Sequence, residues 1–412
     1  MKKLLVILDG LGDLPCRDLG GKTPLEAAHT PYLDALAKKS TAGMLRIAGN
    51  IAPESDVGVF SVLGYDPFKY HVGRGALEAY GIDAGFRNGM LGLRANFATT
   101  DAEGTKIFDR RVGRHLGSTD AKALEKEINK KVRLTNASFV FRATLGHRGV
   151  LLIKSREKLS AKISNTDPAY EIKKGLGSAK SVFEMRVQKS KPLERSAAAS
   201  RAAALVNEFT AKAHFVLEKS RVNARRKKRG LLPANEILLR DAETEVRRPP
   251  TLYGREKWAV LADMPLEIGI GKLIGMNVIH APPPTFTASD YATRAGKTLA
   301  LLKKFDGVYV HIKGPDLFGH DGDATGKMKS IEDIDRFFFA PLLKKLNLTK
   351  TRMAVTADHS TPCKIKAHSS DPVPFLTAGA GVFGKGVSKF GESACRKKGV
   401  KQGPWLMHQL LS

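Results

Sequence analysis

The chain of 412 residues is 42% hydrophobic and 26% charged, which is typical of a globular protein and excludes a disordered or fibrous one. Its length exceeds what one hydrophobic core usually serves, so we expect two domains, and no apolar run is long enough to cross a bilayer. The formal net charge of +27 indicates either an anion-binding funnel or a solvated basic surface.

The N-terminal segment alternates strand and helix signals. The apolar run 4–8 predicts a buried strand that delivers Asp9 to a glycine-rich loop. Because Asp9 ends this run so early, it does not make a signal peptide, and we expect a cytoplasmic protein. Thr23 and Glu26 have the spacing of a capping box that starts a helix, and residues 31–39 continue as a second helix.

Residues 52–58 predict a turn that opens a helix ending at Leu63, with Ser55 near the start of that helix. The exposed N–H groups and positive dipole at a helix N-terminus stabilise a phosphate, and a metal ion beside a serine hydroxyl can lower its pKa. Ser55 is therefore a candidate nucleophile. The alternative is that Ser55 only caps the helix, as most such serines do.

The middle of the chain has a different character. It carries strand-like runs at 92–98, 138–144 and 149–153, and two helical segments at 121–130 and 197–218. The double proline at 249–250 can continue neither a helix nor a strand, so it predicts a linker.

Strand signals resume at 259–262 and 277–280, and two later apolar runs are each followed by strong metal ligands. These ligands fall within about one eighth of the sequence and are Asp316, His320, Asp358, His359 and His368. Loops at the carboxyl ends of parallel strands are where open α/β sheets place their chemistry. A mixture of carboxylates and imidazoles suits Mn²⁺ or Zn²⁺ better than Ca²⁺.

Asp9 and Ser55 precede the middle section, whereas the other candidate ligands follow it. If they form one site, the middle section must be an insertion. We therefore expect a discontinuous metal-binding domain of residues 1–67 and 249–412, interrupted by a substrate-binding domain of residues 68–248.

The cysteines and the basic run 221–230 have plainer interpretations. Cys16, Cys363 and Cys395 are too scattered for a disulfide framework or a paired-cysteine zinc site. The basic run lacks interleaved aromatic residues, so a nucleic-acid partner is not expected despite the charge.

Five motifs, in this order along the chain, resemble the archaeal-type cofactor-independent phosphoglycerate mutases of the alkaline-phosphatase superfamily. They lie at 7–13, 22–28, 55–67, 73–78 and 314–322, and the resemblance extends over essentially the whole chain. It implies an α/β fold, with an alkaline-phosphatase-like doubly wound sheet domain and an inserted α+β substrate domain.

The resemblance also implies two divalent metal ions (Mn, Zn, Mg or Co) and no bisphosphoglycerate. One ion would be held by Asp316, His320 and His368, and the other by Asp9, Ser55, Asp358 and His359. Two ions about 3.5–4 Å apart can clamp the attacking and leaving oxygens of an in-line displacement.

In this family the inserted domain supplies basic residues that bind the substrate. The matching candidates here are Arg110, Arg111, Arg114, His147, Arg148, Arg225 and Arg226, with Lys272 outside the insertion. Asp109 is the candidate for handling the glycerate hydroxyl protons.

The implied reaction interconverts 3-phosphoglycerate and 2-phosphoglycerate through a phosphoserine, in glycolysis and gluconeogenesis. A metal-dependent phosphatase or another sugar-phosphate mutase of the superfamily remains the alternative, since the metal ligands alone do not separate them. The sequence leaves the oligomeric state open.

Overall fold

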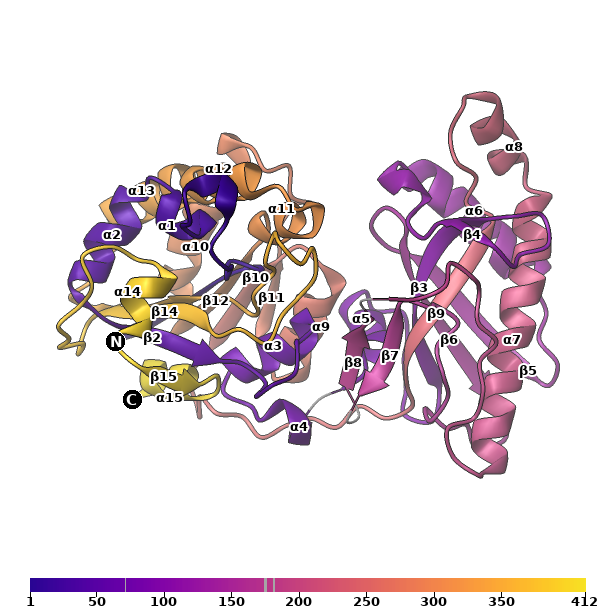
Figure 1. Ribbon diagram of the computed structural model, residues 1–412. Helices are drawn as coiled ribbons and strands as arrows, with labels where there is room; N and C mark the ends of the chain where they lie inside the picture. Colours follow the sequence, from indigo (N-terminus) through magenta and orange to yellow (C-terminus); the bar gives the residue numbers. More distant parts are fainter. Residues whose placement is uncertain (71, 174–175, 181) are drawn as a thin grey trace. The chain divides into compact units, whose positions relative to one another are not determined.

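Figure 1 shows the computed structural model, which describes residues 1–70, 72–173, 176–180 and 182–412. By their internal contacts these residues form two compact units. The first consists of Met1–His71, Arg248–Asp263 and Ile270–Ser412, and the second of Val72–Arg247 and Met264–Gly269. The α/β fold class expected from the sequence is confirmed.

The first unit is built on an eight-stranded sheet. Its strands, in spatial order, are β11 (Asn277–His280), β10 (Trp258–Ala262), β12 (Gly307–Ile312), β1 (Lys2–Leu8), β13 (Thr351–Thr356), β14 (Val373–Gly379), β2 (Ser40–Arg46) and β15 (Val400–Gln402). The first five strands are parallel, and β14 pairs antiparallel with both β13 and β2.

The centre of this sheet is apolar on both faces. Every residue of β12 and β13 is buried, as are all residues of β1 after Lys2. Parallel strands covered by helices on both sides have this continuous hydrophobic pattern, which is why the apolar runs predicted them correctly.

The register of β1 with β12 and β13 determines where the polar residues that follow these strands lie. Leu8 of β1 lies opposite Ile312 of β12, and Ile7 lies opposite Thr356 of β13. The three central strands therefore end almost level. The residues that follow them lie at the same edge of the sheet, although those after β1 are more than 300 positions from those after β12 and β13.

Helices cover the two faces of this sheet. Figure 1 shows α2, α10, α12 and α13 on one face and α15 on the other, where α15 also contacts α3. The helices of the first unit are α1 (Pro24–Ala27), α2 (Pro31–Lys38), α3 (Ser55–Val62), α4 (Pro67–Tyr70), α10 (Ala288–Lys304), α11 (Pro315–Asp321), α12 (Ala324–Ile334), α13 (Ala340–Lys345), α14 (Glu392–Arg396) and α15 (Trp405–Leu411). The expected capping box of Thr23 and Glu26 is present at α1.

The second unit is an α+β structure around an antiparallel sheet. Strands β4 (Ile107–Asp109), β3 (Leu91–Thr100), β6 (Arg148–Ser155) and β5 (Ala137–Ala143) form it in that order, with β9 (Glu236–Glu243) also paired to β3, and β7 (Tyr170–Lys173) and β8 (Leu176–Ala179) form a separate hairpin. Its helices are α5 (Arg74–Gly81), α6 (Ser118–Lys131), α7 (Ala197–Glu218) and α8 (Arg221–Lys228).

The core of the second unit lies between this sheet and helices α6 and α7. Phe97 and Phe141 pack edge to face with ring centroids 5.5 Å apart, and Phe209 of α7 joins them. Aromatic pairs in this arrangement add about 0.5–1.5 kcal/mol beyond their buried area.

Residues 264–269, the start of α9 (Pro265–Leu273), group with the second unit, which the sequence analysis did not foresee. The reason is close helix packing through glycines. A Cβ at Gly81 would meet the carbonyl of Pro265, and one at Gly269 would meet the carbonyl of Leu77. No helix among the described residues is long and apolar enough to cross a membrane.

Helix α3 approaches the sheet closely through Gly58. A Cβ on Gly58 would overlap the carbonyl oxygen of Asp358, just beyond β13, so the absent side chain lets α3 and its first residue Ser55 lie against this loop. We predict that Gly58→Ala lowers the free energy of unfolding by about 1–3 kcal/mol through overpacking.

The matched control is Gly296→Ala in α10, where nothing lies within 4 Å of the added Cβ. There the helix propensity of alanine should raise the unfolding free energy by about 1 kcal/mol. Urea denaturation of the two variants checks both values, and equal effects would contradict the role given to Gly58.

Candidate functional site

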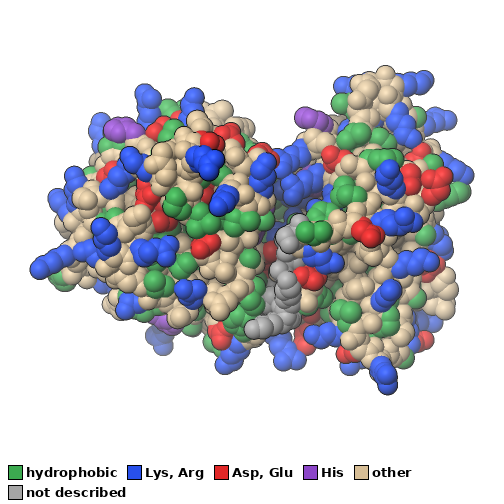
Figure 2. All heavy atoms as spheres, viewed as in Figure 1, with side chains coloured by type: hydrophobic (Ala, Val, Ile, Leu, Met, Phe, Trp, Pro, Cys, Tyr) green, Lys and Arg blue, Asp and Glu red, His purple; other side chains and the backbone are tan. Residues whose placement is uncertain are grey.

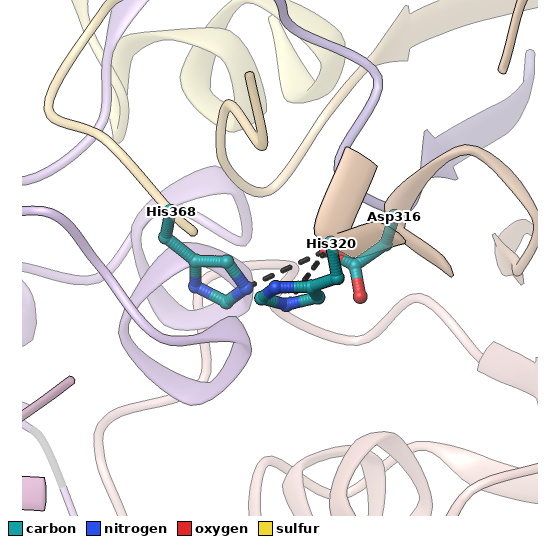
Figure 3. A group of neighbouring side chains, drawn as sticks. All are labelled: Asp316, His320 and His368. Carbon is teal, nitrogen blue, oxygen red and sulfur yellow. Dashed lines mark ion pairs between the residues drawn. The ribbon is translucent and has the colours of Figure 1, made fainter. Parts of the chain in front are cut away.

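Three of the predicted ligands come together at α11 (Figure 3). Asp316 and His320 lie one helical turn apart, and His368 reaches them from the loop after β13. The Nε2 atoms of His320 and His368 lie 3.6 and 3.5 Å from Oδ1 of Asp316. We call these residues the α11 group.

The two imidazoles of the α11 group are oriented by backbone carbonyls. Nδ1 of His320 lies 3.1 Å from the carbonyl of Lys366, and Nδ1 of His368 lies 2.8 Å from that of Pro53. Because a carbonyl can only accept, Nδ1 carries a proton in each ring, which leaves Nε2 as the atom directed at Asp316.

A second, fully buried group follows β1 and β13. Nε2 of His359 lies 3.5 Å from Oδ1 of Asp9 and 3.3 Å from Oδ2 of Asp358. Stacking of His359 on His368, with ring centroids 3.7 Å apart, joins this β1–β13 group to the α11 group. All six predicted protein ligands other than Ser55 are thus found in two adjoining groups.

Ser55 lies at the same place. It is the first residue of α3, and its Oγ is 3.3 Å from Nε2 of His359. Glu54 provides no side-chain hydrogen bond as the N-cap of α3. The hydroxyl therefore faces the β1–β13 group from a helix terminus, where positive dipole and free N–H groups favour a phosphate.

A positive charge would stabilise the two buried carboxylates of the β1–β13 group. Burial, with the charge of Asp9 second, raises the pKa of Asp358 well above its usual value. Burial opposes ionisation of Asp9 too, but the charges of Lys313, His311 and His359 together outweigh it and lower the pKa of Asp9. Burial, followed by the neighbouring His368, lowers the pKa of His359 well below its usual value.

These features fit a cation site. Oδ1 of Asp9 and Oδ2 of Asp358 are buried and have no hydrogen-bond partner among the described residues, although both point toward Nε2 of His359. Buried acceptors in such a position are costly unless a cation or donor satisfies them. The mixed oxygen and nitrogen donors suit a borderline or hard divalent ion.

Two residues near Asp9 were missed by the sequence analysis. Lys313 places its Nζ 2.8 Å from Oδ2 of Asp9, and His311 places its Nε2 4.0 Å from Oδ1 of Asp9 and 3.9 Å from Oδ2 of Asp358. His311 was hidden inside an apolar strand run. Lys313 follows directly after β12, a position that could have identified it.

In the second unit, basic residues gather around His147. Burial lowers the pKa of His147 to about 2, and the next contributions come from Arg148, Arg111, Arg94 and Arg114 in that order. The structure therefore brings four of the predicted substrate-binding residues into one electrostatic environment, together with Arg94, which the sequence analysis missed.

We call the four arginines around His147 the arginine cluster: Arg94, Arg111, Arg114 and Arg148. Arg94 is its most buried member. It is buried in the centre of β3, and burial, followed by the charge of Arg74, lowers its pKa to about 9. Its Nε lies 3.5 Å from Oε1 of Glu78, whereas its Nη1 has no hydrogen-bond partner among the described residues. An anionic ligand would satisfy this donor and relieve the repulsion between the arginines.

Other predicted residues of the second unit have internal partners. Arg110 forms a two-pronged ion pair with Asp167, at 2.9 and 2.8 Å. The buried Arg226 binds the carboxylate of Asp120 at 2.9 Å and the carbonyl of Leu232 at 3.0 Å.

The remaining predicted residues are more dispersed. Arg225 is exposed on α8, and Lys272 is half-buried in α9. Asp109 ends β4 and accepts a hydrogen bond of 2.6 Å from the backbone N–H of Arg111, which connects it to the arginine cluster.

Figure 2 shows how the positive charge is distributed over one face. On this face, Lys and Arg side chains are spread over both units. For the charge on this face, such a distribution favours a solvated basic surface. The arginine cluster around His147 is a separate, partly buried feature.

Metal binding should depend on pH through His368. Burial alone would lower its pKa, but the hydrogen bond and the charge of Asp316, with smaller contributions from the Pro53 carbonyl and Glu54, together outweigh burial and raise the pKa to about 9. A cation competes with this proton, so Mn²⁺ affinity should weaken about tenfold for each unit that the pH falls below about 9. Calorimetric titrations in buffers of different ionisation enthalpy would measure the affinity and the released proton.

In His368→Gln, binding should be weaker and this pH dependence should disappear. The control is His408→Gln, a substitution of an exposed histidine on α15, which should keep the slope of the wild type. A wild-type affinity that is constant between about pH 7 and 9 would refute the assignment.

Comparison with known proteins agrees with this geometry. A family model described as 2,3-bisphosphoglycerate-independent phosphoglycerate mutase matches residues 37–223. A protein of that name from Aeropyrum pernix is 41% identical over 404 residues, covering 96% of this chain and 94% of the relative. One from Thermococcus kodakarensis is 37% identical over 405 residues, covering 97% and 93%.

Two solved structures are also similar. A protein from Pyrococcus horikoshii superimposes with a TM-score of 0.79 at 30% identity, covering 100% of this chain and 97% of the other. The cofactor-independent phosphoglycerate mutase from Thermoplasma acidophilum gives a TM-score of 0.61 at 31% identity and covers 100% of both chains. The chain therefore belongs to the family of 2,3-bisphosphoglycerate-independent phosphoglycerate mutases.

Proposed function

We propose that this chain is an isomerase that interconverts 3-phosphoglycerate and 2-phosphoglycerate without bisphosphoglycerate, in the cytoplasm, as a step of glycolysis and gluconeogenesis. The observation that carries the proposal is the position of Ser55, whose Oγ lies 3.3 Å from Nε2 of His359 at the N-terminus of α3. Curated relatives at 41% and 37% identity bear the name of this activity.

Ser55 is proposed as the nucleophile. Its Oγ forms a bond to phosphorus while the bond between phosphorus and the substrate oxygen breaks, which leaves a phosphoserine and glycerate. The other hydroxyl of the glycerate then attacks the same phosphorus, releases Ser55, and completes the transfer. Both are in-line displacements, and protons pass from the attacking to the leaving oxygen.

Divalent cations fit this scheme. The α11 group and the β1–β13 group with Ser55 would each hold one ion, of which Mn²⁺, Zn²⁺, Mg²⁺ and Co²⁺ are candidates. Bound there, the ions would lower the pKa of the serine hydroxyl and neutralise charge on the transferring phosphoryl group.

The second unit is proposed as the substrate-binding domain. Phosphoglycerate carries a phosphate and a carboxylate, and arginine binds both with paired hydrogen bonds. Arg111, Arg114 and Arg148 are proposed to bind these groups, with Arg94 as the buried donor at the centre of the cluster. Asp109, held by the N–H of Arg111, is proposed to exchange protons with the glycerate hydroxyls.

We predict that Ser55→Ala lowers mutase turnover by at least about a thousandfold, because it removes the nucleophile while all six carboxylate and imidazole side chains of the two groups remain. Acid-quenched mass spectrometry of the wild type should find phosphate on the peptide that contains Ser55. Ser61→Ala is the control, since Ser61 lies on the same helix and donates to the carbonyl of Ile47. A Ser55→Ala variant that keeps wild-type mutase activity would refute the phosphoserine route.

The substitution Arg94→Met should weaken catalysis without destabilising the folded protein. Because burial lowers the pKa of Arg94, its charge is disfavoured in the folded protein, and removal should preserve or raise the free energy of unfolding. The loss of a buried anion donor should lower kcat/KM by about a hundredfold.

The control for this prediction is Arg142→Met on β5, where the side chain is 44% exposed and should affect neither quantity. Phosphoglycerate mutase assays and urea denaturation check both values. An Arg94→Met variant that unfolds more easily and keeps its kcat/KM would show that Arg94 is structural.

A further inference from the structure

One buried hydroxyl connects the two candidate metal groups. The side chain of Thr361, a fully buried residue, places its Oγ1 2.7 Å from Oδ1 of Asp316 and 3.0 Å from Nδ1 of His359. Asp316 belongs to the α11 group and His359 to the β1–β13 group. Thr361 was not among the residues predicted from the sequence.

The direction of these two hydrogen bonds is fixed by chemistry. A hydroxyl has one proton to donate, and an ionised ligand carboxylate can only accept. Thr361 therefore donates to Asp316, so its remaining contact, with Nδ1 of His359, must be one that it accepts. Nδ1 of His359 thus carries a proton, and Nε2 is left with its lone pair.

This tautomer suits the site. Nε2 of His359 is the atom that faces Ser55, Asp9 and Asp358. In His320 and His368, backbone carbonyls, which always accept, likewise fix a proton on Nδ1. The hydroxyl of Thr361 could either donate or accept, so its effect on His359 depends on Asp316 of the other group.

Thr361 is itself held firmly. Its N–H donates to the carbonyl of Gly12 at 3.0 Å, and its carbonyl accepts from Nζ of the buried Lys327 at 2.9 Å. A Cβ at Gly10 or at Gly319 would overlap Thr361, so both glycines leave room for it. A side chain fixed in this way has little freedom to choose other partners.

We propose that Thr361 is a positioning residue that sets the tautomer of His359 through Asp316 and thereby couples the two metal groups. The proposal rests on the ligand sets of the proposed function. Because it concerns a proton on a ring nitrogen, it can be tested without any turnover.

The test compares Thr361→Val, which keeps the shape but loses the hydroxyl, with Thr361→Ser, which keeps the hydroxyl. Thr298→Val is the matched control, since Thr298 is fully buried and its hydroxyl donates to the carbonyl of Arg294, away from both groups. Two readouts are measured on the full chain: ¹⁵N NMR of the histidine rings after chelation, at about pH 8, and Mn²⁺ affinity by EPR.

In the wild type, Thr361→Ser and Thr298→Val, the His359 ring should carry its proton on Nδ1. In Thr361→Val the ring should shift toward the form protonated on Nε2, and Mn²⁺ affinity should fall about 10- to 100-fold. The Thr361→Ser variant should bind Mn²⁺ within a few-fold of the wild type.

A wild-type His359 protonated on Nε2, or a Thr361→Val variant with the wild-type tautomer and affinity, would overturn the proposal. Failure of the mutase assay in the wild type, with the tautomer and affinity changes as expected, would instead refute the proposed function and leave the role of Thr361 intact.

Discussion

The candidate metal site of the first unit depends on the parallel pairing of β1 with β12 on one side and with β13 on the other. Because these strands end almost level, the loops that follow them deliver Asp9, Asp316 and Asp358 to one edge of the sheet. A shift of one residue in either pairing would turn every side chain of a strand to the opposite face. The register of these pairings therefore fixes the positions of the ligands, and the apolar burial of all three strands stabilises the sheet.

Both units hold buried charges of one sign close together. In the first, the charge of Asp9 opposes ionisation of Asp358, and in the second Arg94 lies among other arginines. Folding alone gains nothing from such arrangements, because desolvation and repulsion both cost free energy. They become more favourable when a ligand of opposite charge binds, which supports the proposal that each unit binds a charged ligand.

The sequence predicted the features that are local or that repeat along the chain. Continuous apolar runs identified the central strands, and the spacing of Thr23 and Glu26 identified the start of α1. The six ligand side chains followed from their positions after strands and from the family resemblance. Arg226 shows the limit, because its partner Asp120 lies 106 positions away and only the folded chain reveals that they meet. Thr361 and Arg94 escaped notice for the same reason, since their importance comes from neighbours distant in sequence.

The position of β1 has a consequence for biosynthesis. This strand is made before both of its neighbours, which begin about 300 and about 350 residues later. At about 5–20 residues per second, the ribosome needs roughly 15–60 s to produce β12, and until then the apolar segment 4–8 has neither of its neighbouring strands. The second unit is nearly continuous in sequence and can fold during that interval. Lys2 and Lys3 at the start of β1 place positive charge beside the waiting strand, which discourages its aggregation on the ribosome.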